Sequence, residues 1–144
     1  MGAEATDPSA FERDHRRAEG SSDATVDAVG KVSEGFEWIE RARGHLYEFH
    51  HLMGHADGLF DEAATALDAA GHPREAEAFR GRVVGRDILE GQWSFQVVEE
   101  YDRRYYEVVR DAHLAVRDAL SEGRPHVFEA EMKAARRADP RNAI

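Results

Sequence analysis

The sequence predicts an all-α protein, a helical bundle of two long and two shorter helices that follows a disordered N-terminal tail. Three observations predict this class. Apolar residues recur at helical spacing over long stretches, glycine and proline interrupt these stretches in a few places, and no alternating strand pattern of useful length occurs. A chain of 144 residues fits one domain and can bury a core without disulfide bonds.

The N-terminal segment contains few side chains that could join a core. Its sizeable apolar residues beyond the first position are Phe11, Val26 and Val29. These are too few to offset the conformational entropy that such a segment loses when it becomes ordered. We therefore predict a flexible acidic tail over residues 1–30 and a single helical-bundle domain over residues 31–140.

The first helix carries the longest apolar pattern in the chain. Ser33 is placed to cap its N-terminus, and Glu34 and Glu37 follow where the helix dipole favours acidic residues. We expect the pattern to face the core, with His45 buried near its centre, and to stop at Gly71. This predicted stripe consists of Trp38, Ala42, His45, Phe49, Leu52, Ala56, Leu59, Phe60, Ala63 and Leu67.

Glycine and proline delimit the other helices. Pro73 suits the first position of a second helix. Ser94 is placed to cap a third helix, which ends at Gly123. A short fourth helix is expected over residues 126–138, because a proline follows two residues later.

The length of the first helix and its glycines raise a question of geometry. A straight helix over residues 33–70 would be about 57 Å long, too long for one compact domain of this size unless it kinks or the protein dimerises. Gly44, Gly54 and Gly58 lie along one face, and each costs about 0.8 to 1 kcal/mol relative to alanine. They indicate close approach of another backbone or a ligand, a kink near residues 54–58, or compositional drift in a GC-rich genome.

Composition excludes several classes of site and partner. The chain has no cysteine, which excludes disulfides and thiolate metal sites and fits a cytoplasmic location. Acidic residues outnumber Lys plus Arg by 29 to 19, for a net charge of −10, so a nucleic-acid partner is not expected. No stretch approaches the roughly 18 apolar residues of a membrane span, and no signal-peptide pattern opens the chain.

Clustered histidines give the chain one candidate metal site. Glu48, His51 and His55 share one face of the first helix in an ExxHxxxH pattern, with Glu62 two turns further on. Imidazole and carboxylate on one face can bind iron, manganese or zinc. The alternative is a solvated acidic face. The full predicted ligand set is Glu48, His51, His55, Glu62, Asp102 and His113, the last two from the third helix.

Two hypotheses for function follow. The chain contains no GxSxG elbow, Walker loop or HExxH motif, so the sequence assigns it to no enzyme class. The first hypothesis is non-catalytic self-association or partner binding. We expect a homo-oligomer such as a homodimer, and binding to another protein is the alternative. The second is a transition-metal-binding bundle that could act as a metal-dependent oxidoreductase. The predicted bundle domain contains one Glu-x-x-His motif, at Glu48 and His51, so a symmetric dimer would have to supply the second.

Overall fold

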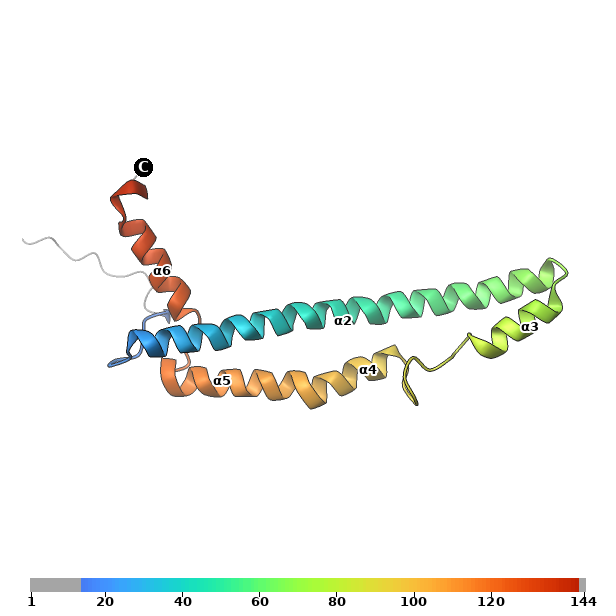
Figure 1. The fold of residues 1–144 in the computed structure, drawn as a ribbon, viewed down its shortest axis with the longest axis horizontal. Coiled ribbons are helices and arrows are strands. Elements are labelled where there is room, and N and C mark those ends of the chain that lie inside the picture. The colour runs from blue at the N-terminus through green and yellow to red at the C-terminus, as the bar shows by residue number, and fades with distance from the viewer. Residues whose placement is uncertain (1–13, 143–144) are drawn as a thin grey trace, which may run out of the picture. The chain divides into compact units, whose positions relative to one another are not determined.

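The computed structural model describes residues 14–142, and these residues are almost entirely helical, as Figure 1 shows. The predicted all-α class is confirmed. Within the described range the extended backbone is limited to one isolated antiparallel bridge between Leu89 and Gln92. The elements are α2 (Asp23–Ala69), α3 (Pro73–Arg82), α4 (Ser94–Tyr101), the π-helical η1 (Asp102–Tyr106), α5 (Glu107–Ser121), α6 (Val127–Ala138) and the 3₁₀ turn η2 (Pro140–Asn142).

The chain divides into two compact units. The described part of the first, the terminal unit, comprises residues 14–38 and 108–142, and the second, the central unit, comprises Ile39–Glu107. Each unit takes one portion of α2 and pairs it with later helices. A single domain over residues 31–140 stays a prediction.

Helix α2 begins earlier than the sequence pattern indicated. It starts at Asp23, not at Ser33, and Ser22 caps it, because the Ser22 hydroxyl accepts a hydrogen bond from the Thr25 amide at 3.1 Å. Val26 and Val29 are buried, so the end of the predicted tail forms the first turns of a packed helix. Residues 1–13 of that tail lie outside the described residues.

Helix α2 also runs without interruption through its glycines. Its 47 residues include Gly54 and Gly58, so the helix does not break there. Whether these glycines mark a kink stays one of the alternatives. A Cβ atom built on Gly44, Gly54 or Gly58 would meet nothing within 4 Å. The close backbone approach that these glycines indicated is therefore not made by the described part of this chain.

In the terminal unit, α5 and α6 pack on the first turns of α2. The His113 ring of α5 stacks on Phe36 with ring centroids 4.8 Å apart, and its Nε2 is hydrogen-bonded to the Ser33 hydroxyl at 3.1 Å. Helix α6 approaches closely at Gly30, where an added Cβ would lie 3.2 Å from Cβ of Phe128. Glycine at position 30 thus lets the two backbones come together.

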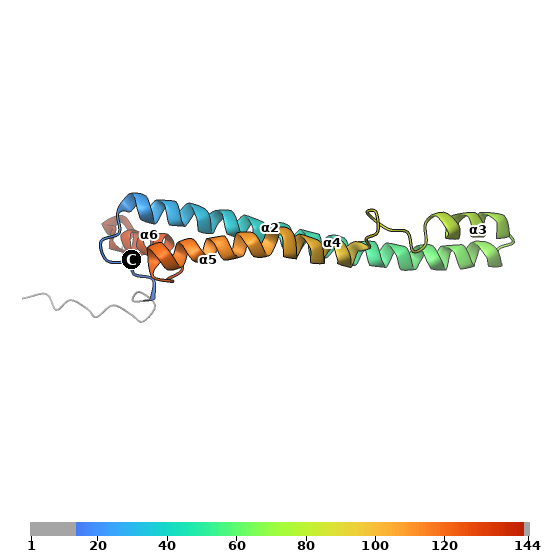
Figure 2. The same cartoon turned by 90° about the horizontal axis from the view of Figure 1, so that it is seen from below.

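In the central unit, α4 and α3 lie alongside successive parts of α2 (Figures 1 and 2). Val98 of α4 is buried. Phe79 of α3 packs edge-on against Phe60 with ring centroids 5.5 Å apart. Beside this pair, Ala64 and Ala76 are almost fully buried, because small side chains allow the two helices to approach closely.

The turn between α2 and α3 is held by backbone hydrogen bonds around Gly71. The His72 amide donates to the Leu67 carbonyl at 2.9 Å and the Gly71 amide to the Asp68 carbonyl at 3.1 Å. Gly71 has a φ of 90°, which a residue with a Cβ adopts only with strain. Pro73 then begins α3.

We expect Gly71→Ala to lower the free energy of unfolding by about 1 kcal/mol, because alanine is strained at positive φ. Gly54→Ala is the matched control. It lies inside α2 with open space around it, so it should raise the free energy of unfolding by about 0.8 to 1 kcal/mol. Urea denaturation followed by circular dichroism measures both. Equal stabilisation by the two substitutions would contradict this account of the turn.

Candidate functional site

The predicted stripe of α2 is largely uncovered. Leu52 is 58% exposed and Leu59 is 50% exposed, and His45, expected to be buried, is exposed as well. The prediction that this stripe faces the core is therefore wrong for most of its length. We call its central-unit part the outer stripe, and it consists of Ala42, His45, Phe49, Leu52, Ala56, Leu59 and Ala63.

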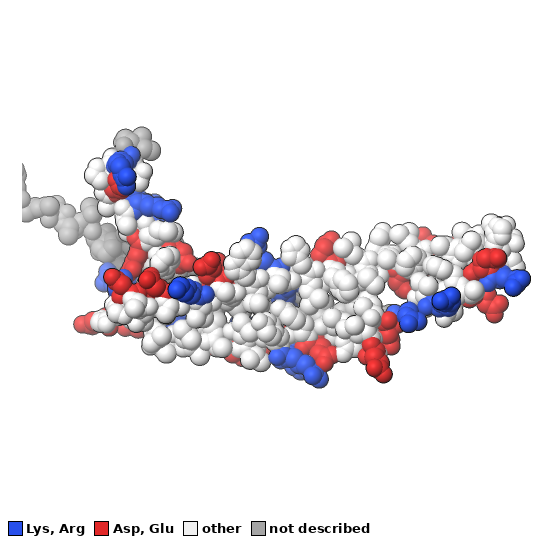
Figure 3. Space-filling model, in the orientation of Figure 1, with Lys and Arg blue, Asp and Glu red and all other residues white. Residues whose placement is uncertain are grey.

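A second apolar line on α2 takes the place of the predicted one. Ile39, Leu46 and Met53, which were not in the predicted stripe, are half-buried together with Leu67, its last member. They lie on the side of the helix that holds the contacts to the later helices. Because α2 is apolar along two adjacent lines, its sequence pattern alone did not indicate which of the two would be buried. On the face seen in Figure 3, uncharged residues predominate along α2 and charged residues gather in small groups.

The buried core is correspondingly small. Among the described residues, the buried apolar side chains are valines and alanines, and no large side chain is fully buried. Large apolar side chains in α2, α4 and α6 are instead partly exposed. The buried apolar residues are Val26, Val29, Ala64, Ala76, Val98 and Val127.

An ionic and aromatic cluster joins α2 to η1. Both carboxylate oxygens of Asp102 accept hydrogen bonds from the Arg43 guanidinium, at 2.7 and 2.8 Å. The same guanidinium lies 4.9 Å from the ring centroid of Tyr47 and 4.6 Å from that of Tyr106, a cation–π arrangement. The Tyr106 hydroxyl donates to the Glu40 carboxylate. The hydrogen bonds from Arg43 hold the pKa of Asp102 below its usual value, although partial burial acts in the opposite direction.

This cluster lies on the π-helical segment η1, and π-helical turns are often found at functional sites. Asp102 and Tyr106 are four residues apart, and both contact side chains of α2. Asp102 was predicted as a metal ligand, but a metal would have to displace Arg43 from its two oxygens.

His50 and Ser94 form a second link between α2 and α4. His50 Nδ1 and Ser94 Oγ are hydrogen-bonded at 2.7 Å, and Ser94 is buried. Ser94 was predicted to cap α4, but the N-cap is Trp93, whose amide donates to the Gln96 side chain at 2.8 Å. A nucleophilic serine needs a histidine that a third group orients, whereas the ring beside His50 is that of His51, 5.3 Å away. We interpret the pair as a packing contact.

The predicted metal ligands are divided between the two units. Glu48, His51, His55 and Glu62 are exposed on α2 in the central unit. His113 belongs to the terminal unit, where burial lowers its pKa below the usual histidine value. That these residues bind one ion stays a prediction.

The structure does bring together a different histidine and carboxylate group. One ligand atom each from Glu37, His126 and Glu129 lies within 4.8 Å of the others, the group of this kind found among the described residues. His126 and Glu129 are three apart at the start of α6, a spacing visible in the sequence. Glu37 comes from α2, and only the folding of α6 onto α2 adds it.

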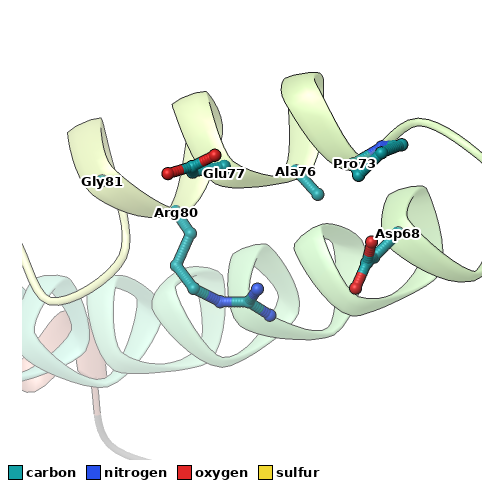
Figure 4. A pocket seen from close by; sticks show the side chains of 6 residues that line it. All are labelled: Asp68, Pro73, Ala76, Glu77, Arg80 and Gly81. Atoms are coloured by element: carbon teal, nitrogen blue, oxygen red, sulfur yellow. The ribbon is translucent and has the colours of Figure 1, made fainter.

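Hollows on the surface offer little convergent chemistry. Figure 4 shows the one between α2 and α3, of about 340 Å³, with Arg80 extending from α3 toward α2. Its guanidinium donates to the Thr65 hydroxyl at 3.0 Å, so it serves to hold the two helices together. A larger hollow of about 650 Å³ in the terminal unit lies beside Phe128 and Met132 and is edged by acidic residues and Lys31.

We expect Asp102→Asn to lower the free energy of unfolding at pH 7 by about 1.5 kcal/mol, because it removes the charge that Arg43 binds. The pKa of Asp102 is depressed in the folded protein. Its contribution is therefore complete above the ordinary carboxyl pKa and is lost as the pH falls through the folded value. Denaturation at pH 7 and below pH 4 should show the difference between wild type and variant shrinking in acid. Asp111→Asn, which removes an exposed ion pair with Arg110, should leave stability nearly unchanged.

Comparison with known proteins adds no relative from which a function could be carried over. No protein-family model matches the chain, no curated protein matches it, and no solved structure matches it. None of the helices in residues 14–142 is both long enough and apolar enough to cross a membrane.

Proposed function

We propose that this chain is a non-catalytic protein that self-associates into a homo-oligomer through the outer stripe of α2. The observation that carries the proposal is the exposure of Leu52 and Leu59, 58% and 50%, in a structure whose described residues bury few apolar side chains. Burial of apolar surface contributes about 25 cal/mol per Å². Contiguous exposed apolar surface on a helix is typical of an interaction site.

Charge supports a second copy as the partner. The chain carries a net charge of −10, so two copies repel each other on average. The outer stripe contains no acidic residue, which makes it a surface where two copies can meet without opposing carboxylates. The same net charge supports a protein partner over nucleic acid. The absence of cysteine fits action in the reducing cytoplasm, which we propose as the location.

We expect the wild-type protein to sediment as a dimer, at about twice the 16.2 kDa of one chain. Leu52→Glu should raise the dimer dissociation constant on the order of a hundredfold or more, because the interface would bury two carboxylates. Leu89→Glu is the matched control, since Leu89 is 57% exposed against 58% for Leu52 but lies in the loop before α4. Sedimentation velocity over a concentration series measures all three. A monomeric wild type, or equal loss of association in both variants, would contradict the proposal.

Transition-metal binding is the second candidate function, and the group of Glu37, His126 and Glu129 favours it. One imidazole and two carboxylates suit zinc, and manganese and iron accept the same donors. The sequence-predicted set centred on Glu48, His51 and His55 is the competing location.

We expect zinc retained after dialysis to be lost in His126→Asn and kept in His51→Ala if the structural group is the site. Asparagine is chosen because His126 has a φ of 58°, which asparagine tolerates. Elemental mass spectrometry of the dialysed proteins gives the stoichiometry. The reverse pattern would favour the set around His51, and no retained metal in the wild type would remove this second function.

A further inference from the structure

The outer stripe has the spacing of a coiled-coil seam. His45, Leu52 and Leu59 are seven residues apart, and Trp38 continues this row toward the N-terminus. A second row, also at intervals of seven, lies four residues after each member of the first. Alternating intervals of four and three are the a and d positions of a heptad repeat. The second row is Ala42, Phe49, Ala56 and Ala63.

We propose that α2 pairs with α2 of a second copy as an antiparallel coiled coil centred between Phe49 and Leu52. This inference rests on the proposed self-association and adds its direction and register. Phe49 faces Leu52 of the second copy. In the flanking layers Ala56 faces His45, and outside them Ala42 faces Leu59 and Ala63 faces Trp38.

The sizes of the side chains favour the antiparallel direction. In a parallel dimer each residue faces its own copy, so layers of two alanines lie among layers of two tryptophans, histidines, phenylalanines or leucines. Such layers require different separations between the helices and leave gaps at Ala42, Ala56 and Ala63. In the antiparallel register each of these alanines faces a larger side chain, which keeps the separation even and the packing dense.

The charges beside the seam favour this one register. The residue before each member of the second row lies at one side of the seam, and we call these residues the charged edge. They are Arg41, Glu48, His55 and Glu62. In the proposed register Arg41 lies beside Glu62 of the second copy, and Glu48 lies beside His55. A shift of one heptad in either direction would place Glu48 against Glu48 or Glu62 instead. Opposed charges such as those of Arg41 and Glu62 select partners and orientation in coiled coils, and the contacts between carboxylates in the shifted registers are unfavourable.

The opposite edge of the seam is already occupied within each chain. Ile39, Leu46 and Met53 lie there and are half-buried on the side of α2 that contacts the later helices. The outer stripe is therefore the apolar line of α2 that the described residues leave largely exposed, and we place the second copy there. Glu48 and His55, predicted as metal ligands, become interface residues in this arrangement.

The absence of native cysteine makes the register measurable by disulfide trapping. His45→Cys and Ala56→Cys proteins are prepared separately, mixed, and equilibrated in a glutathione redox buffer. We expect the mixture to form a disulfide-linked heterodimer, seen by non-reducing electrophoresis and mass spectrometry, because the two positions face each other. Each protein alone should form at least tenfold less linked dimer.

The controls separate the alternatives. His45→Cys mixed with Ala63→Cys should not link, and linkage there would show a register shifted by one heptad. Linked homodimers of His45→Cys alone would show a parallel pair. Either result overturns the inference. A wild type that sediments as a dimer, together with His45→Cys and Ala56→Cys proteins that fail to link when mixed, overturns this inference alone. A monomeric wild type overturns the proposed self-association with it.

A charge exchange tests the edge independently. Arg41→Glu should raise the dimer dissociation constant about tenfold, because two symmetry-related pairs are lost. Arg41→Glu combined with Glu62→Arg should restore it, since the pair is re-formed in the opposite sense. Failure of the double variant to recover would overturn the proposed register.

Discussion

The long helix α2 carries more apolar surface than the other helices in residues 14–142 cover. Its 47 residues hold two adjacent apolar lines, whereas the helices beside the central part of α2, α3 and α4, have 10 and 8 residues. One line, represented by Leu46 and Met53, is partly covered, and the other, represented by Leu52 and Leu59, is left exposed. Exposed apolar surface of this extent is unfavourable in water, and this cost is the basis of the proposed self-association.

Polar contacts decide which line is covered. Arg43 lies on the covered side of α2, and its two hydrogen bonds to Asp102 fix η1 against that side. The hydrogen bond between His50 and Ser94 fixes α4 against the same side of α2, about two turns further along the helix. Buried or partly buried polar groups need partners, so these pairs specify one rotation of α2 where hydrophobic burial alone would accept two.

The four histidines between residues 45 and 55 have different surroundings in the structure. His50 faces α4, His45 lies on the outer stripe, and His51 and His55 are exposed. Four histidines close in sequence therefore serve at least three different surroundings, since each residue turns about 100° around the helix axis. They are close in sequence but do not form one group in space. Of the four, only His55 lies on the charged edge of the proposed seam.

The sequence by itself determined the all-α class, the turn at Gly71, the start of α3 at Pro73 and the approximate bounds of α6, because glycine, proline and apolar periodicity act locally. It did not determine the burial of Val26 and Val29, which depends on α5 and α6 packing against them from far along the chain. Nor did it determine which apolar line of α2 is covered, or that Glu37 meets His126. Those features depend on contacts between distant segments, and only the tertiary structure decides them.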